Sequence, residues 1–396
     1  MPASPGGRSR APLLITLAGF VALGAPDGIL GVAWPSIRAT FGLPLAGLGG
    51  LLVCLTAGYL VGSAASGFIA DRLGPAAVLG AGFGASTLAA LAYAVAPRWP
   101  VLLVAAAAFG LGSGTVDAGG NAHLALNHGV RAMNLLHACY GVGAAAGPAA
   151  LTGLLARGLT WRLAYAGLLA VDLALVAAVA VTWRRWPGGR PRAVARPSSG
   201  GPLPVALVRL VVATLAMFFV YTAVEVATGQ WSYTFLVTGR MAPAPLAGLA
   251  VSAFWASLTI GRVLGAVAGG RLGPLGLLHL SVAMTVTATV LYWLAPAAPL
   301  ALAAVAAVGF ALAPFFPALV TLTSRRVGER AAARVVGFQL AAAGAGGSLG
   351  AAAIGLALQQ GGVGLLGPCL VAGAAVLAAL HVATTYASRD RDRSWT

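Results

Sequence analysis

The sequence contains no lysine and few charged residues of any kind. Only 8% of its 396 residues are charged, 59% are hydrophobic, and the mean hydropathy is +0.91. A soluble globular domain carries roughly 25% charged residues, so this chain could not cover a water-facing surface. A polytopic membrane protein fits the composition, because a spanning helix needs only about 20 mostly apolar residues.

Other scarcities exclude further classes of protein. Cys54, Cys139 and Cys369 lie in apolar runs without a CxxC or a His/Cys cluster, so we expect neither a disulfide framework nor a metal site. The net charge of +16 comes from Arg in short breaks between apolar segments, whereas a nucleic-acid-binding surface would gather it on one face. No nucleotide-binding loop, HExxH or GxSxG motif is present, so we expect no cofactor and no enzyme activity.

The apolar segments predict an all-α membrane protein with twelve transmembrane helices in two pseudo-symmetric six-helix bundles. The runs are too long and continuous for the strands of an outer-membrane barrel. We expect bundles at 12–182 and 207–386, a basic cytoplasmic linker at 183–206, and cytoplasmic tails at 1–11 and 387–396. The predicted spans are 12–34, 46–70, 76–96, 101–126, 132–156, 162–182, 207–237, 246–270, 274–295, 299–323, 333–358 and 365–386.

Arg residues and an internal repeat both support this organisation. Arg is concentrated in alternate breaks, which places both termini in the cytoplasm. We therefore expect a monomeric, multi-pass protein of the cell (inner or plasma) membrane. Gly62–Pro75 reads GSAASGFIADRLGP and Gly261–Pro274 reads GRVLGAVAGGRLGP. Such duplication across a central loop is typical of two-bundle transporters.

Four of the eight acidic residues fall inside predicted spans, namely Asp27, Asp117, Asp172 and Glu225. An acid at the bilayer centre costs about 2.5–3.5 kcal/mol, so it usually marks a transport pathway or a partner. Asp27 follows Pro26 where the helix is loosened, and its carboxyl group could carry a proton from one side to the other. The alternative is a structural carboxyl bonded to the loosened backbone. Asp172 receives no role.

Polar side chains gather around Asp117. Asn121 is four residues on and shares its helix face, and the next span carries Asn134, His137 and Tyr140 at three-residue spacing. A cavity lined by these groups would suit a polyhydroxylated or otherwise polar solute. The alternative is a hydrogen-bond cluster that only holds two helices together.

The second half offers a third predicted proton-coupling residue, Glu225, on one helical stripe with Tyr221. Arg262 is expected to form a structural ion pair rather than to contact the solute. Trp231 suits sugar stacking and an interfacial anchor equally well. The residues of this half that we expect to bind the solute are Tyr221, Gln230, Trp231 and Gln339, the last because it occupies the place of His137 in the repeat.

The stretch Gly67–Pro75, GFIADRLGP, resembles the loop between helices 2 and 3 of the major facilitator superfamily. Asp71 and Arg72 stand in the places of the residues that serve in gating there, whereas the second copy has Gly270 in place of the acid. The resemblance covers nearly the whole chain. It implies alternating access by rocking of two bundles.

Within that superfamily the chain resembles the fucose:proton symporter group. The similar stretches are APDGIL at Asp27, TVDAGGNA at Asp117, NLLHACYGVGAAAGP at His137, and GFALAPFFPALVTL. In that group the first-helix and fourth-helix acids serve in proton coupling and sugar binding, which would fall on Asp27 and Asp117. The sequence differs in having Asp117 where the symporter has Glu and His137 where it has Gln.

These features together predict a secondary active transporter that moves a sugar or similar small polar solute, coupled to proton symport. Its partners would be the solute, protons and the lipid bilayer. A proton antiporter that exports drugs or metabolites uses the same fold and similar acids, so this alternative stays open.

Overall fold

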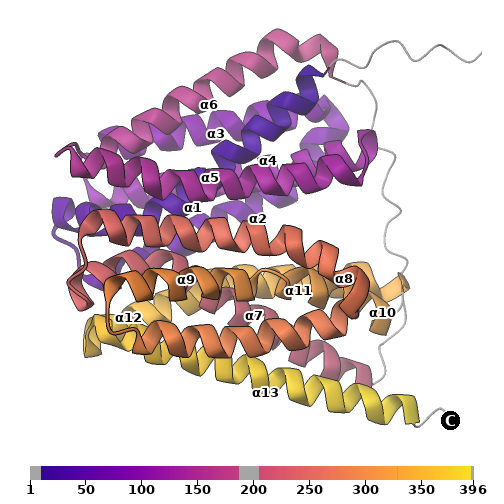
Figure 1. Ribbon diagram of the computed structural model, residues 1–396. Helices are drawn as coiled ribbons and strands as arrows, with labels where there is room; N and C mark the ends of the chain where they lie inside the picture. Colours follow the sequence, from indigo (N-terminus) through magenta and orange to yellow (C-terminus); the bar gives the residue numbers. More distant parts are fainter. Residues whose placement is uncertain (1–9, 187–204, 328, 394–396) are drawn as a thin grey trace, which may run out of the picture. The chain divides into compact units, whose positions relative to one another are not determined.

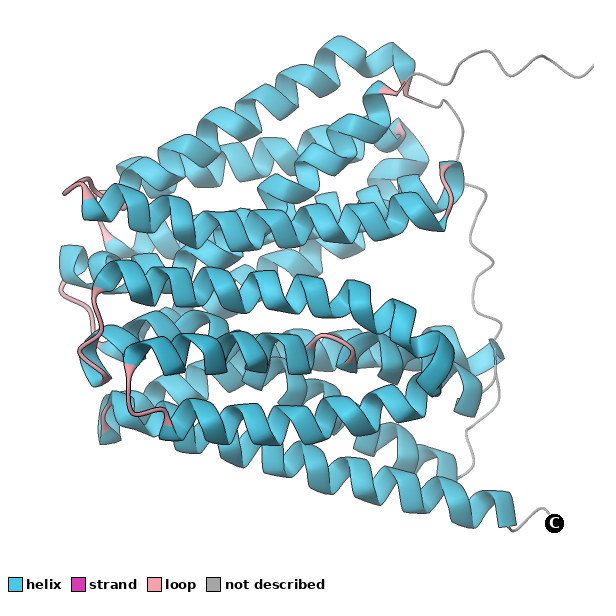
Figure 2. Ribbon diagram, in the orientation of Figure 1, coloured by secondary structure: helices cyan, strands magenta, loops and turns pink. Residues whose placement is uncertain are grey.

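The computed structural model describes residues 10–186, 205–327 and 329–393. Within these ranges the chain consists of helices and short connections, and it contains no strand (Figure 1, Figure 2). The expected all-α architecture is confirmed for this part. The helices are α1 (Ala11–Phe41), α2 (Leu48–Leu73), α3 (Pro75–Val95), α4 (Trp99–Asn127), α5 (Val130–Ala156), α6 (Arg162–Thr182), α7 (Val205–Thr234), α8 (Ala244–Leu294), α9 (Ala298–Leu312), α10 (Phe315–Val327), α11 (Glu329–Ala345), α12 (Ala351–Gly361) and α13 (Leu366–Arg393).

Eleven helical segments of the described part are long and apolar enough to cross a membrane. The segments 298–327 and 334–361 each combine two labelled helices, α9 with α10 and α11 with α12. One segment, α8, is 51 residues long and covers two of the predicted spans, 246–270 and 274–295. Each of the others corresponds to one predicted span. A helix needs only about 20 residues to cross the hydrocarbon core, so α8 is far longer than a single crossing requires.

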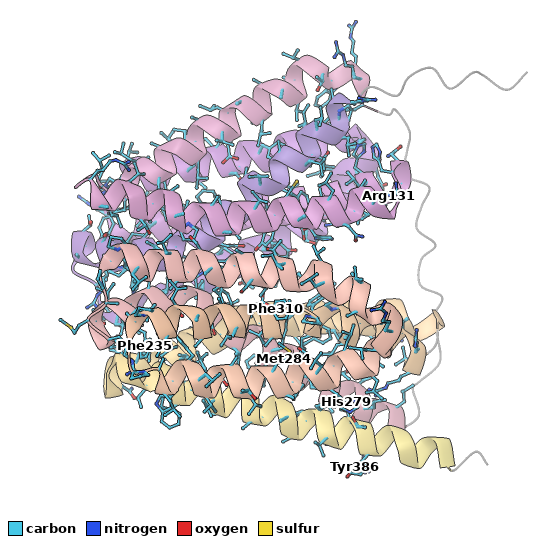
Figure 3. All side chains as sticks on the ribbon, viewed as in Figure 1. Arg131, Phe235, His279, Met284, Phe310 and Tyr386 are labelled. Carbon is cyan, nitrogen blue, oxygen red and sulfur yellow. The ribbon has the colours of Figure 1, made fainter. Side chains whose placement is uncertain are left out.

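The backbone of α8 leaves the helical conformation at Gly273, which has φ 66° and ψ 170° and precedes Pro274. Beyond this point the chain doubles back. A hydrogen bond shows this, because it joins Arg240, just before α8, to the carbonyl of Trp293 near the end of α8. Figure 3 accordingly shows His279, just past the break, toward the opposite end of these helices from Phe235. Gly74 has the matching conformation, φ 84° and ψ 174°, before Pro75. The sequence repeat therefore places the same backbone break in both halves.

Helices α2 and α4 approach each other through glycines. A Cβ atom at Gly58 would lie 1.9 Å from the backbone oxygen of Ala107, and one at Gly110 would lie 1.9 Å from that of Leu55. Only a residue without a side chain fits such a distance. Small residues commonly provide this packing in lipid, where no hydrophobic force drives helices together.

Helices α1 and α5 approach each other in the same way. A Cβ atom at Gly24 would lie 2.0 Å from the backbone oxygen of Tyr140, and one at Gly143 would lie 1.9 Å from that of Val21. These contacts fix the register of α1 against α5. They bring the polar residues of the two helices to the same level.

By its contacts the chain divides into two compact units. The first comprises Met1–Asp27, Cys54–Gly147 and Arg157–Val194, and the second comprises Gly28–Val53, Pro148–Ala156 and Ala195–Thr396. The division into two six-helix bundles at the linker, 183–206, stays a prediction. Residues 187–204 of that linker and 1–9 of the N-terminal tail lie outside the described residues, whereas residues 387–393 of the predicted C-terminal tail continue α13.

The second unit includes segments from the first half of the chain because they pack directly on α7, α8 and α12. Gly31 of α1 lies against the backbone of Gly229, and Thr152 of α5 lies against Gly248. The side-chain oxygen of Gln359 accepts a hydrogen bond from the backbone N–H of Ala46 at 2.9 Å. The second half of α1 thus belongs to a different unit from Asp27 and the residues before it.

Candidate functional site

Asp117 lies on α4 with both carboxyl oxygens hydrogen-bonded. The phenol of Tyr59 of α2 donates a hydrogen bond to Oδ2 at 2.5 Å, and Nδ2 of Asn121 donates one to Oδ1 at 2.9 Å. The i, i+4 spacing of Asp117 and Asn121 therefore produces a direct contact on one helix face. Tyr59 is not among the residues that the sequence predicts for the site, although it directly follows Gly58, which packs closely against α4.

Asp27 of α1 accepts a hydrogen bond from the phenol of Tyr140 of α5 at 2.6 Å. The pair is positioned by the close contact of α1 and α5. Tyr59 also interacts electrostatically with Asp27, so its phenol lies near both carboxyl groups. We call Asp27, Tyr59, Asp117 and Tyr140 the acid–phenol cluster; all four side chains are half-buried.

His137 of α5 adjoins this cluster. It is near enough to Asp117 to interact electrostatically, and its ring meets Phe20 of α1 edge-on at a centroid distance of 6.3 Å. His137 as a whole is exposed. Asn134, which was predicted beside it, is exposed and makes no hydrogen bond within the described part of the chain. The structure therefore brings together Asp27, Asp117, Asn121, His137 and Tyr140, without a contact from Asn134.

Glu225 of α7 has different partners. The phenol of Tyr221, one turn earlier, donates a hydrogen bond to Glu225. The Arg262 guanidinium of α8 lies 3.7 Å from the other carboxyl oxygen. The Glu225 side chain is 12% exposed and the Arg262 side chain 34% exposed. The ring of Tyr221 stacks on Phe315 with centroids 4.9 Å apart. Arg262 thus has the ion-pair partner that its position in the sequence predicted.

The other polar residues expected at the solute site in the second half are buried. Gln339 donates hydrogen bonds to Thr214 at 3.1 Å and Thr323 at 2.7 Å, which joins α11 to α7 and α10. The Trp231 indole donates to the carbonyl of Ala351 at 3.0 Å. Gln230, Trp231 and Gln339 are all at most 3% exposed. Trp231 is therefore packed inside the second unit rather than presented as an interfacial anchor.

The two residues expected in gating, Asp71 and Arg72, are exposed at the end of α2. The Arg72 guanidinium lies 3.7 Å from the centre of the Phe68 ring. Asp71 forms no ion pair or hydrogen bond within the described residues. The contact of Arg72 is therefore with a residue of its own helix.

A match to a sequence-family model identifies the family of this chain. The model of the Major Facilitator Superfamily matches residues 16–393, nearly the whole chain. The chain belongs to the major facilitator superfamily. It is a multi-pass membrane protein and a transporter rather than an enzyme. No curated protein sequence matches the chain significantly.

Solved structures of transporters share the fold at low sequence identity. A D-xylose–proton symporter superposes with a TM-score of 0.73 at 15% identity, over 93% of this chain and 96% of that one. A mutant of the nucleoside transporter NupG gives a TM-score of 0.75 at 14% identity, over 95% and 99%. A bacterial homologue of the human lysosomal transporter Spinster, inward-facing and occupied, gives 0.71 at 16% identity, over 96% of each chain. At such identities the likeness concerns the fold alone.

Proposed function

We propose that this chain is a secondary active transporter that moves a sugar or similar small polar solute by alternating access, coupled to proton symport. The observation that carries the proposal is the acid–phenol cluster on four helices long enough to cross the membrane. Ionisable groups within transmembrane helices are costly and usually functional. This cluster is a concentration of such groups.

Protons are the proposed coupling ion because the hydrogen-bond partners of Asp117 are uncharged and its electrostatic neighbour, His137, can itself bind a proton. A phenol and an amide can hydrogen-bond the carboxylate, and the phenol oxygen can also accept a hydrogen bond from the protonated acid. The same neighbours therefore accommodate both protonation states. Asp27, which accepts a hydrogen bond from Tyr140, has a similar environment. We propose Asp27 and Asp117 as the coupling residues.

A polar solute is proposed because hydrogen-bonding groups surround the two acids. Asn121, His137 and Tyr140 present an amide, an imidazole and a phenol, which suit hydroxyl groups. The xylose–proton symporter and the nucleoside transporter among the structural neighbours support this class of solute. The narrower resemblance to the fucose:proton symporter group stays a prediction.

We also propose twelve crossings, with α8 contributing two of them on either side of Gly273. The doubled-back path of α8 and the paired breaks at Gly74 and Gly273 support this count. An even number places both termini on one side, and the distribution of Arg makes that side the cytoplasm.

The test is uptake of labelled hexoses, pentoses and nucleosides into proteoliposomes with and without an inward proton gradient. We expect gradient-dependent accumulation by the wild-type protein. Asp27→Asn should abolish that accumulation and leave counterflow exchange partly intact, because exchange needs no net proton movement. Thr287→Ala is the control, since it changes an exposed polar side chain of α8 outside the acid–phenol cluster.

Normal accumulation by Asp27→Asn would remove Asp27 from coupling. An absence of uptake for every solute tested, with proton-driven export of a toxic compound, would favour the antiport alternative. In that case deletion in the host would increase its sensitivity to the compound.

A further inference from the structure

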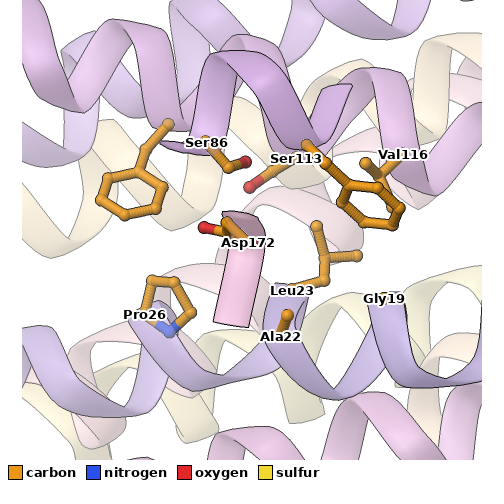
Figure 4. Close-up of a pocket in the computed structure, with 10 residues that line it drawn as sticks. Gly19, Ala22, Leu23, Pro26, Ser86, Ser113, Val116 and Asp172 are labelled. Atoms are coloured by element: carbon orange, nitrogen blue, oxygen red, sulfur yellow. The ribbon is translucent and has the colours of Figure 1, made fainter. Parts of the chain in front are cut away.

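A small cavity lies inside the first unit, between α1, α3, α4 and α6 (Figure 4). Its polar lining consists of Asp172 from α6, Ser86 from α3 and Ser113 from α4. Ala22 and Pro26 of α1 close it on another side, and apolar side chains complete the wall. The space is large enough for about one water molecule.

The polar side chains of this cavity have no hydrogen-bond partner among the described residues. Asp172 is 5% exposed and Ser86 is 8% exposed, and neither forms a hydrogen bond or an ion pair within those residues. Ser113 likewise makes none there. A buried polar group without a partner is costly, and a buried unpaired carboxylate costs much more. Water in the cavity could satisfy these groups.

Helix α1 adds a backbone acceptor at the same place. Pro26 has no N–H, so the carbonyl of Ala22, four residues earlier, loses its helical donor. Freed backbone groups of this kind are tolerated within the membrane where they line a cavity or meet another partner. Both Ala22 and Pro26 line the cavity that contains Asp172.

We propose that Asp172 is a proton-binding residue, held as a neutral carboxylic acid whose O–H group donates a hydrogen bond to a water molecule in this cavity. The water accepts from the acid and donates to the hydroxyl of Ser86 or Ser113 and to the carbonyl of Ala22. A neutral acid avoids the cost of an unpaired buried charge, and one water satisfies several otherwise unpartnered groups. When the proton leaves to bulk water, the carboxylate has only the neutral hydroxyl groups of Ser86 and Ser113 and the water as donors.

This site would influence the helix that carries Asp27. The carbonyl that the water satisfies belongs to the last turn before Pro26, and Asp27 follows directly. Protonation of Asp172 would stabilise α1 at the missing hydrogen bond of Pro26, so Asp172 would act as a positioning residue for Asp27. Asp172 lies outside the acid–phenol cluster, and its protonation would not depend on which solute is carried.

Other titratable groups lie farther away. On the helices that form the cavity, the nearest along the chain are Asp27 of α1, Tyr93 of α3, Asp117 of α4 and Tyr165 of α6. Among the described residues none of these interacts electrostatically with Asp172. A titration at this site should therefore be separable from that of the cluster.

The test is infrared difference spectroscopy of the full-length protein in lipid, comparing acidic with alkaline buffer. A background of Asp27→Asn with Asp117→Asn removes the cluster acids. We expect a carbonyl-stretch band of a protonated carboxylic acid that disappears at alkaline pH. Asp172→Asn should remove the band, and Ser113→Ala should shift its frequency without abolishing it. A band unaffected by Asp172→Asn, or the absence of any band, would overturn the proposal.

Thermal unfolding across pH gives a second measurement. The wild-type protein should lose stability toward alkaline pH, because the folded state favours the protonated acid more than the unfolded state does. Asp172→Asn should reduce this loss, and the exposed control Asp71→Asn should not. Specific stabilisation of the wild type by NaCl over choline chloride, lost in Asp172→Asn, would overturn the proposal in favour of a sodium site.

Discussion

The two compact units surround their intramembrane acids differently. Asp117, in the first unit, receives its hydrogen bonds from a phenol and an amide, both uncharged. Glu225, in the second, also receives a phenol hydrogen bond but has the Arg262 guanidinium 3.7 Å away. The arginine supplies a fixed positive charge, whereas a phenol can hydrogen-bond either form of an acid. We infer from this contrast that coupling depends on the first unit and that Glu225, which the sequence predicts as a third coupling residue, has a structural role.

The largest expected effect is therefore on transport by Asp117→Asn. The amide retains a similar shape but cannot change its charge, so proton-driven accumulation should fall to background. Glu225→Gln should retain a measurable part of that accumulation. Uptake into proteoliposomes, normalised to inserted protein, makes the comparison. Equal loss in both variants, with normal thermal stability, would show that both units contribute a coupling acid.

The next effect is on stability. Arg262→Ala leaves the Glu225 charge without its cation. Breaking a fully buried pair costs about 3–5 kcal/mol, and because Arg262 is 34% exposed we expect about 2 kcal/mol here. The double variant Glu225→Gln with Arg262→Ala should recover much of the loss. Thermal unfolding of all four forms measures the interaction free energy between the two side chains. Strictly additive effects would argue against the ion pair.

A smaller effect is expected for Tyr59→Phe, which removes one hydrogen bond to Asp117 and no packing volume. A hydrogen bond to a charged group contributes about 1.5–3 kcal/mol, so the pH at which accumulation is half-maximal should shift. Tyr221→Phe removes the equivalent phenol beside Glu225 and should leave that pH unchanged. Matching shifts in the two variants would remove the distinction between the units.

The sequence predicted much of this arrangement because intramembrane polar residues are few and costly. The four-residue spacing of Asp117 and Asn121 places them on one helix face. The position of Arg262 inside a predicted span predicts an ion pair. The pairing of Asp27 with Tyr140 could not be predicted from spacing, because it depends on how α1 packs on α5. The two residues are 113 positions apart.

Other features could not be predicted for a related physical reason. A single tyrosine in an apolar run, such as Tyr59, has no periodic signal that distinguishes it from a packing residue. The sequence around Trp231 suits sugar stacking and an interfacial anchor equally well. Its full burial depends on tertiary packing. Asp172 was recognised as intramembrane, but the serines beside it come from two other helices.

The smallest effect concerns the repeat that relates the two halves. Gly74 and Gly273 adopt a backbone conformation that is essentially restricted to glycine, and a Cβ atom at either position would meet nothing within 4 Å. Gly74→Ala and Gly273→Ala should therefore each cost about 1–3 kcal/mol through backbone strain alone. Gly67→Ala and Gly270→Ala are matched controls, because both positions are helical and equally open, and they should be neutral or slightly stabilising. Thermal unfolding of the four variants separates strain from steric clash. A loss at Gly74 without one at Gly273 would mean that the second break is not required in the folded state, and that the two halves share a sequence motif without sharing its structural role.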